Sequence, residues 1–190
     1  RVLSATLPDP DGAGAQTSPV YEYTYNLAGS LLSSTDPLGQ TTSYTYDALQ
    51  RRTSVTAPDP DGAGGLSAPV TTYVYGSQAA IDTITDALGH DVTFSYDNAG
   101  RQTQVADHEG NVTTFAYDLA NRLTSVTLPD PDGGGSQTSP VTSYSYDALN
   151  RLTTIADANS GETHFHYDAA SNLVSLLDPV GNETSWAYDA

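Results

Sequence analysis

Three kinds of side chain in this sequence are of types that could do chemistry, and the first is a set of paired aspartates. They lie two residues apart in a Pro-Asp-Pro-Asp-Gly stretch that occurs three times, which supplies Asp9, Asp11, Asp59, Asp61, Asp130 and Asp132. Two carboxylates and a glycine partly match a calcium loop, but no further acidic residue follows within the next ten positions. We interpret these aspartates as turn formers whose side chains bond backbone amides, with structural calcium as the alternative.

Histidines are the second kind, and their spacing predicts no site. His164 and His166 share one face of an expected strand, but zinc requires a third or fourth ligand, and no spacing marks one. His90 and His108 fall in glycine-containing turns and have no visible partner in the sequence. We expect all four to be structural or solvent-facing.

No nucleophilic or acid–base machinery is visible either. Serine and threonine are abundant, but there is no Gly-x-Ser-x-Gly elbow with partnered His and Asp. Carboxylate pairs of the kind used in glycoside hydrolysis would not be unique in so repetitive a chain. We therefore predict that the chain is not an enzyme and expect no cofactor beyond the calcium weighed above.

Arginines are the third kind, and they recur at one position. Where a Tyr-Asp pair precedes it, the arginine stands five residues after the tyrosine, and the set comprises Arg1, Arg51, Arg101, Arg122 and Arg151. A guanidinium at such a position can pair with a turn aspartate or lie on a tyrosine ring of the neighbouring strand. We expect a structural role for these residues, with ligand binding as the alternative.

Composition excludes several classes of protein. The chain has 190 residues, a net charge of −17, no Lys and no Cys. Such a surface repels nucleic acid, and no disulfide or thiolate chemistry exists. No apolar run is long enough to cross a membrane, so we expect no membrane insertion. The sequence starts inside a repeat and stops just after a motif, so we expect a fragment of a longer protein.

The elements that position these residues follow from an aromatic-x-Tyr motif. It occurs eight times and accounts for 16 of the 17 aromatic residues, and Asp follows in six cases. The second tyrosines are unevenly spaced, with a short step from Tyr25 to Tyr46 and a long one from Tyr46 to Tyr75. The pattern starts again at Tyr96, which predicts a 71-residue superperiod of one 29-residue and two 21-residue units. We treat residues 1–190 as one repeat array.

Each 21-residue unit predicts two short strands and two turns. In one unit the strands are expected at residues 102–106 and 111–117, with Thr113, Phe115 and Tyr117 on one face. Asp36-Pro37-Leu38-Gly39 suits a type I turn followed by a left-handed glycine. The eight extra residues of the long units are rich in proline and predict protruding loops at about 7–20, 57–70 and 128–141. The predicted fold is all-β, a continuous antiparallel meander of hairpins that twist makes coil.

The core of this meander is predicted to be an aromatic ladder. A lone hairpin is marginal in water, whereas successive hairpins give every strand a neighbour. Each covered ring buries roughly 150–250 Å². We expect the ladder to be completed by the aliphatic residues Val55, Val105, Val126, Ile155 and their equivalents.

The repeat resembles the YD repeat of the bacterial RHS and wall-associated protein family. Asp118-Leu-Ala-Asn-Arg122-Leu, Asp147-Ala-Leu-Asn-Arg151-Leu and the Asp-Pro-x-Gly turns carry the resemblance over the whole chain, and the Pro-Asp-Pro-Asp-Gly loops are additions to it. The motif residues are Tyr46, Asp47, Arg51, Tyr96, Asp97, Arg101, Tyr117, Asp118, Arg122, Tyr146, Asp147, Arg151, Tyr167 and Tyr188. The resemblance implies a spiral β-sheet that forms a hollow shell, often enclosing a toxic C-terminal domain.

Our leading hypothesis is a structural segment of a large secreted or cell-surface bacterial protein, forming the wall of a hollow β-spiral tube, fibre or shell. Its partners are neighbouring repeats of the same chain, with self-association into a fibre as a further expectation. The alternatives are an adhesin-like module that presents its acidic loops and a part of a toxin-enclosing shell.

Overall fold

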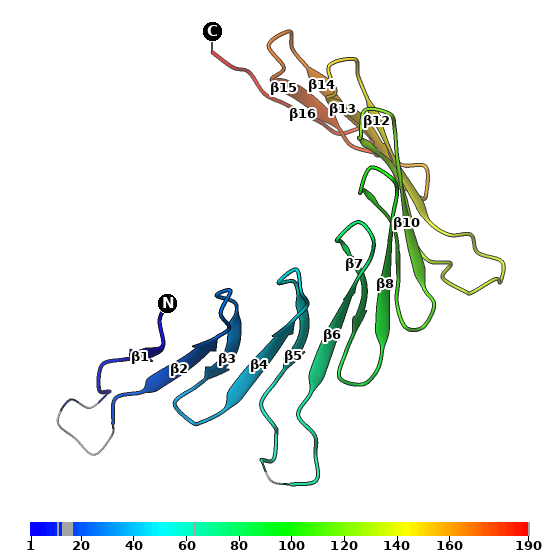
Figure 1. Ribbon diagram of the computed structural model, residues 1–190. Coiled ribbons are helices and arrows are strands. Elements are labelled where there is room, and N and C mark those ends of the chain that lie inside the picture. The colour runs from blue at the N-terminus through cyan, green and yellow to red at the C-terminus, as the bar shows by residue number, and fades with distance from the viewer. Residues whose placement is uncertain (11, 13–16, 63, 190) are drawn as a thin grey trace. The chain divides into compact units, whose positions relative to one another are not determined.

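The computed structural model describes residues 1–10, 12, 17–62 and 64–189, and these residues form strands, turns and loops without a helix (Figure 1). The strands are joined into a 16-stranded antiparallel sheet whose spatial order is the chain order. Their bounds are β1 (Ser4–Thr6), β2 (Val20–Tyr25), β3 (Leu31–Thr35), β4 (Thr41–Tyr46), β5 (Arg52–Thr56), β6 (Val70–Tyr75), β7 (Ile81–Thr85), β8 (Asp91–Tyr96), β9 (Gln102–Ala106), β10 (Val112–Tyr117), β11 (Leu123–Thr127), β12 (Val141–Tyr146), β13 (Leu152–Ala156), β14 (Glu162–Tyr167), β15 (Leu173–Leu177) and β16 (Glu183–Ser185). The predicted antiparallel meander is confirmed, and its coiling stays a prediction.

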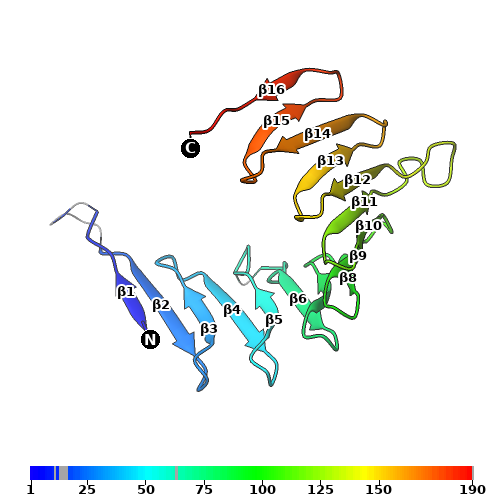
Figure 2. The same ribbon diagram turned by 90° about the horizontal axis from the view of Figure 1, so that it is seen from above.

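The chain divides into two compact units, Arg1–Val92 and Thr93–Ala190, with the boundary inside β8. In the first unit, β1 to β7 pair in succession, and in the second, β9 to β16 do the same (Figure 2). The part of the chain that the structure describes holds no helix with the length and apolar character of a membrane span.

Two kinds of connection alternate along the chain and define two edges of the sheet in each unit. Even-numbered strands lead to the next strand through a five-residue turn that starts directly after the second tyrosine of the motif, at an Asp in most cases, and we call it the YD turn. Odd-numbered strands lead on through an Asp-x-x-Gly/Ser turn or through one of the long loops. We call the side of the sheet that carries the YD turns the YD edge, and the side that carries the other turns and the long loops the loop edge. Both names refer to strand ends and not to the outermost strands. In Figure 1 the β5–β6 loop extends beyond the neighbouring β3–β4 turn.

The long connections are residues 7–19, 57–69 and 128–140, of which 11, 13–16 and 63 are not described. They follow β1, β5 and β11, so the first two are four strands apart and the next two are six strands apart. Although the motif tyrosines keep their 71-residue interval, the loops therefore do not recur at a single interval.

Both kinds of turn use the same backbone geometry. In the Asp-Pro-Leu-Gly turn, the Gly39 N–H donates to the Asp36 carbonyl at 2.9 Å, and Gly39 has a φ of 79°. In a YD turn the corresponding left-handed residue is Asn150, with a φ of 65°, and its N–H donates to the Asp147 carbonyl at 3.1 Å. This is a type I turn followed by a left-handed residue, and the prediction for Asp36–Gly39 is confirmed.

A register shift accompanies each described YD hairpin. Between β10 and β11, for example, Ala116 pairs with Ser125 but Tyr117 pairs with Leu123, so one extra residue is accommodated beside the tyrosine. The same shift occurs at the second aromatic residue of β2, β4, β6, β8, β12 and β14. A bulge of this kind increases local strand twist.

The two faces of the sheet differ, as the two-residue period requires. On one face the first aromatic of most motifs lies opposite an aliphatic residue, as in the cross-strand pairs Phe115–Val126 and Tyr144–Ile155, whereas Tyr23 lies opposite Ser34. The opposite face is rich in hydroxyl groups, such as the Thr45–Ser54 pair, whose oxygens are 2.6 Å apart.

The aromatic ladder is only half-buried, contrary to the prediction of a core. Among the described residues no hydrophobic side chain is buried, and Ser175 is the one buried residue, at 8% exposure. Val55, Val105, Val126 and Ile155 have intermediate exposure. The reason is that a single sheet layer covers its side chains only from the flanks, and within each unit the described strands form one layer. Contacts between adjacent hairpins must therefore hold the array together.

Candidate functional site

The YD turn is built around one aspartate that satisfies the turn's own backbone. Asp147 donates its N–H to the Arg151 carbonyl at 3.0 Å. Its Oδ1 accepts the Leu149 N–H at 2.8 Å and the Arg151 N–H at 2.9 Å. The remaining oxygen, Oδ2, accepts the Arg151 Nε–H at 2.7 Å. The aspartate thus fixes both the loop and the arginine that follows it.

The same bonds recur in the turns that start at Asp47, Asp97 and Asp118, where the guanidinium approaches the carboxylate to 2.7, 2.6 and 2.7 Å. These contacts lower the pKa of each carboxyl because they stabilise its charged form. The arginine's backbone N–H is the main cause for Asp47, Asp118 and Asp147, followed among the lowering contacts by its guanidinium. For Asp97 the guanidinium of Arg101 is the main cause of the lowered pKa.

Each arginine also reaches the next hairpin. The guanidinium of Arg122 lies over the Tyr146 ring, 4.8 Å from its centroid. Its Nη1 donates to the Asp147 carbonyl at 3.2 Å and to Asn150 Oδ1 at 2.9 Å. In return the Tyr146 hydroxyl donates to the Leu123 carbonyl at 2.9 Å. We call this set of contacts the staple, because it joins one YD turn to the next.

The staple recurs along both units. Guanidinium carbons lie 4.4 to 5.9 Å from the ring centroids in the pairs Arg51–Tyr75, Arg101–Tyr117, Arg151–Tyr167 and Arg1–Tyr25. Tyrosine hydroxyls donate to the carbonyl one strand back from Tyr46, Tyr75, Tyr117 and Tyr188. Both contacts expected of the arginine, with a turn aspartate and with a tyrosine face, thus occur together. Tyr96 also interacts within the chain.

Among the YD turns that the structure describes, three lack the arginine, and in each the aspartate or its role also changes. Where Asn26 and Ser30 replace the pair, both side chains donate to Gln50 Oε1 at 2.9 Å, so a neutral amide links this turn to the next. Asn172 bonds Asp168 Oδ2 through its Nδ2 at 2.9 Å, replacing the ion pair with an amide.

The third such turn has Gly76 and Ala80 in place of the pair. The carboxylate of Asp82, on the following strand, fills the space that a side chain at Gly76 would occupy, because a Cβ there would clash with both of its oxygens. A carboxylate is therefore present at this turn too, although it comes from β7.

Sequence reasoning missed two parts of the staple. One is the left-handed residue that accepts the arginine's second hydrogen bond, such as Asn121, whose Oδ1 lies 2.9 Å from Arg101 Nη1. A non-glycine residue that tolerates positive φ at this position was the available signal. The other is Arg52, which lies over Tyr73 at 5.0 Å although it stands outside the repeated arginine position.

The paired aspartates of the long loops bond backbone N–H groups. Asp61 Oδ2 accepts the Leu66 N–H at 3.1 Å, and Asp132 Oδ2 accepts the Gln137 N–H at 3.0 Å. These bonds are the main causes of the lowered pKa of both carboxyls. Asp59 and Asp130 each accept the N–H two residues on, at 3.2 Å.

The described residues contain no group of three or more His, Asp or Glu arranged to hold a metal. Asp9 lies in the first loop and interacts within the chain, whereas Asp11 is outside the described residues. Structural calcium therefore stays a prediction.

His90 and His164 contact acidic side chains, and His108, which was also expected to have no partner, interacts within the chain. His90 was expected to have no partner, but its Nδ1 lies 3.1 Å from Asp86 Oδ2, in the position that Arg takes in a YD turn. The expectation was wrong because both turn types share one geometry, which brings the fifth residue to the aspartate. His164 Nε2 lies 3.2 Å from Glu162 Oε2, and both are on β14.

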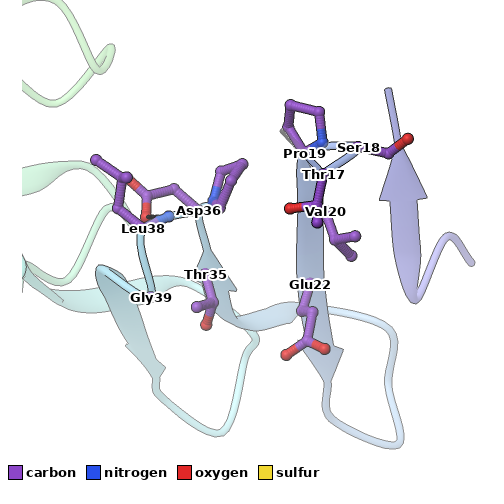
Figure 3. Close-up of a pocket in the computed structure, with 10 residues that line it drawn as sticks. Thr17, Ser18, Pro19, Val20, Glu22, Thr35, Asp36, Leu38 and Gly39 are labelled. Atoms are coloured by element: carbon purple, nitrogen blue, oxygen red, sulfur yellow. Dashed lines mark hydrogen bonds between the residues drawn. The ribbon is translucent and has the colours of Figure 1, made fainter. Parts of the chain in front are cut away.

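A hollow of about 640 Å³ lies at the loop edge of the first unit (Figure 3). One wall is the segment leading into β2, with Pro19 and Val20, and the other is the β3–β4 turn, with Pro37 and Leu38. Glu22 and Thr35, which are paired across β2 and β3, lie at its base. A second hollow, of about 460 Å³, lies on the other side of the same turn, against residues 58–60 and 62.

Comparison with known proteins agrees with this geometry. The RHS Repeat family model matches residues 25–63, 99–134 and 146–183, which together make up more than half of the chain. The chain belongs to the RHS repeat family. No curated protein sequence matches it at a significant level.

Solved structures share the fold. The crystal structure of TcdB2-TccC3-Cdc42 matches with a TM-score of 0.68 and 15% identity over 96% of this chain and 10% of that chain. That of TcdB2-TccC3-TEV matches with a TM-score of 0.50 and 16% identity over 93% of this chain and 11% of that chain. The chain thus spans about a tenth of the length of these relatives, and at this identity the likeness concerns the fold alone.

Proposed function

We propose that this chain is a wall segment, one stretch of a continuous β-sheet that encloses a hollow shell or tube in a larger secreted or cell-surface bacterial protein. The observation that carries the proposal is the staple. It recurs between most neighbouring hairpins and uses the most distinctive residues of the sequence for cohesion between them. No set of side chains in the described residues is left over as a unique reaction centre.

The single-layered sheet supports a role as a wall better than a role as a compact globular domain. A sheet of one layer with a half-buried aromatic face and a hydroxyl-rich face has no interior of its own, so its use lies in the surface it forms. Because each described strand contacts only the strands before and after it, the array can be extended by adding further hairpins. Membership of the RHS repeat family and the shared fold of TcdB2-TccC3-Cdc42 are consistent with this role.

A toxin-enclosing shell is the more specific form of the proposal. It rests on the family resemblance, in which such walls often surround a toxic C-terminal domain. An adhesin-like role has less support, because the described parts of the long loops carry no aromatic side chain. Calcium remains a proposed ligand of the loop aspartates. Self-association through the outermost strands of the sheet also remains a proposal.

Electron microscopy of the native protein that contains this chain tests the proposal. We expect particles with a thin wall around an empty or filled interior, either closed or tubular. Solid globular particles of similar mass would contradict it. A fibre without a lumen would retain the structural role but reject the enclosing wall.

A further inference from the structure

The first unit separates its charges between its two edges. Its three arginines, Arg1, Arg51 and Arg52, all lie at the YD edge. The described carboxylates at the loop edge are Asp9, Glu22, Asp36, Asp59, Asp61, Asp86 and Asp91. No arginine accompanies them, so this edge attracts cations while the YD edge is close to neutral.

The two hollows beside the β3–β4 turn lie within this acidic edge. Their walls include apolar groups on both sides, namely Pro19 and Val20 in one and Pro58 and Pro60 in the other. Leu38 belongs to both hollows and is 84% exposed. An aliphatic side chain that stands in solvent between two hollows gains free energy when a partner covers it.

Carboxylates stand beside these apolar walls. Glu22 is exposed at the base of the first hollow, and Asp59 is exposed in the second. Asp36 has a different role, since its Oδ1 accepts the N–H groups of Leu38 and Gln40 at 2.9 Å and fixes the turn. The hollows thus combine a fixed apolar turn with acidic side chains on either side.

We propose that these hollows bind an extended basic polypeptide segment in which Lys or Arg alternates with aliphatic residues. In an extended chain alternate side chains point to opposite sides, so aliphatic groups can contact Leu38 and the prolines while basic groups meet Glu22 and Asp59. Charge complementarity selects the basic partner, and the apolar turn fixes where it binds. This docking surface is additional to the wall role.

The probe is a fluorescein-labelled Lys-Val-Lys-Val-Lys-Val peptide, with the Glu-Val peptide of the same length as its counterpart, and the readout is fluorescence anisotropy with the 190-residue chain. We expect binding of the Lys peptide only. Leu38→Ser should weaken it about tenfold, which is a change of about 1.4 kcal/mol. Leu88→Ser, at 80% exposure in the equivalent β7–β8 turn, is the matched control and should change it less than about twofold.

A second pair of variants separates a located site from diffuse attraction. Glu22→Gln with Asp59→Asn should weaken binding several-fold more than Glu109→Gln with Glu162→Gln, which removes two charges from the second unit. Equal losses in the two double variants would overturn the proposal and leave only polyanion attraction. Equal effects of the two leucine substitutions, binding of the Glu peptide, or no binding of the Lys peptide would also overturn it.

Discussion

Replacing Arg122 by Ala should destabilise the second unit, because this one side chain joins three groups of the staple. It stacks on Tyr146 at 4.8 Å and donates to the Asp147 carbonyl and to Asn150. It also pairs with Asp118, and its side chain is 27% exposed. Loss of the guanidinium removes one of the two donors to the part-buried Asp147 carbonyl, which keeps the Asn150 N–H, and leaves the Tyr146 ring without its cation.

The magnitude follows from the contacts to the next hairpin. A cation over an aromatic ring contributes about 0.5–2 kcal/mol, toward the lower end at an exposed site. A hydrogen bond from a charged donor contributes about 1.5–3 kcal/mol, reduced here because the carbonyl is reached from the surface. We expect Arg122→Ala to lower the free energy of unfolding by about 2 kcal/mol, with a smaller urea midpoint and an unchanged slope.

A double-mutant cycle with Tyr146→Leu isolates the stack. The coupling free energy should be about 0.5–1 kcal/mol, measured by urea unfolding followed by far-ultraviolet circular dichroism. The matched cycle combines Arg122→Ala with Tyr167→Leu, whose ring lies under Arg151 instead, and should give a coupling near zero. Equal coupling in the two cycles would refute the staple as the source of cohesion. So would a destabilisation by Arg122→Ala smaller than the contribution expected of the stack alone, about 0.5 kcal/mol at an exposed site.

Three further predictions address the turns. The YD-turn aspartates such as Asp47 have a folded pKa below their unfolded value. The stability that they contribute is therefore present above pH about 4 and is lost as the pH falls through the folded pKa. The urea concentration at the midpoint of unfolding should decrease as the pH is lowered through this range. Ala79 has a φ of 60°, so Ala79→Gly should raise the free energy of unfolding by about 0.5–1 kcal/mol, and an unchanged midpoint would show that the turn is not strained. Gly76→Asp alone should destabilise the chain because the new carboxylate meets that of Asp82, whereas Gly76→Asp with Ala80→Arg and Asp82→Thr should recover at least the wild-type midpoint by rebuilding the ion pair. If the triple variant is as unstable as the single one, the interpretation of Asp82 fails.

Much of the fold could be predicted because the signals are local and repeated. The Asp36–Gly39 turn follows from the φ preferences of proline and glycine, and the shared face of Thr113, Phe115 and Tyr117 from strand periodicity. Strand order followed as well, because most connections are five-residue turns, which bring successive strands side by side in antiparallel pairs. Eight copies of one motif made these local inferences support one another.

The burial of the ladder could not be predicted in the same way. Pairing Phe115 with Val126 follows from the motif, but whether a second layer covers that pair depends on the curvature of the sheet and on other parts of the protein. The sequence pattern of a half-covered sheet and that of a fully covered one are the same.

The staple was only partly visible in the sequence for a related reason. The positions of Arg122 and Asp118 suggested a pair, but the acceptor role of Asn150 depends on its left-handed backbone and on the 28 residues of chain that separate it from the arginine. Such contacts arise from the register between hairpins. The hollows around Leu38 depend likewise on loop paths that no local pattern specifies.

Deletion of one complete repeat tests the central claim, that the array is a succession of like hairpins joined only to their neighbours. Removal of residues 97–117 joins Tyr96 directly to Asp118 and restores the motif across the junction. We predict that this shortened chain keeps its β-sheet circular dichroism spectrum and unfolds cooperatively, with a midpoint close to that of the full chain. Removal of residues 97–106, which takes out a single strand and shifts every later register, should abolish folding. An unfolded 21-residue deletion, or a folded ten-residue one, would contradict the account.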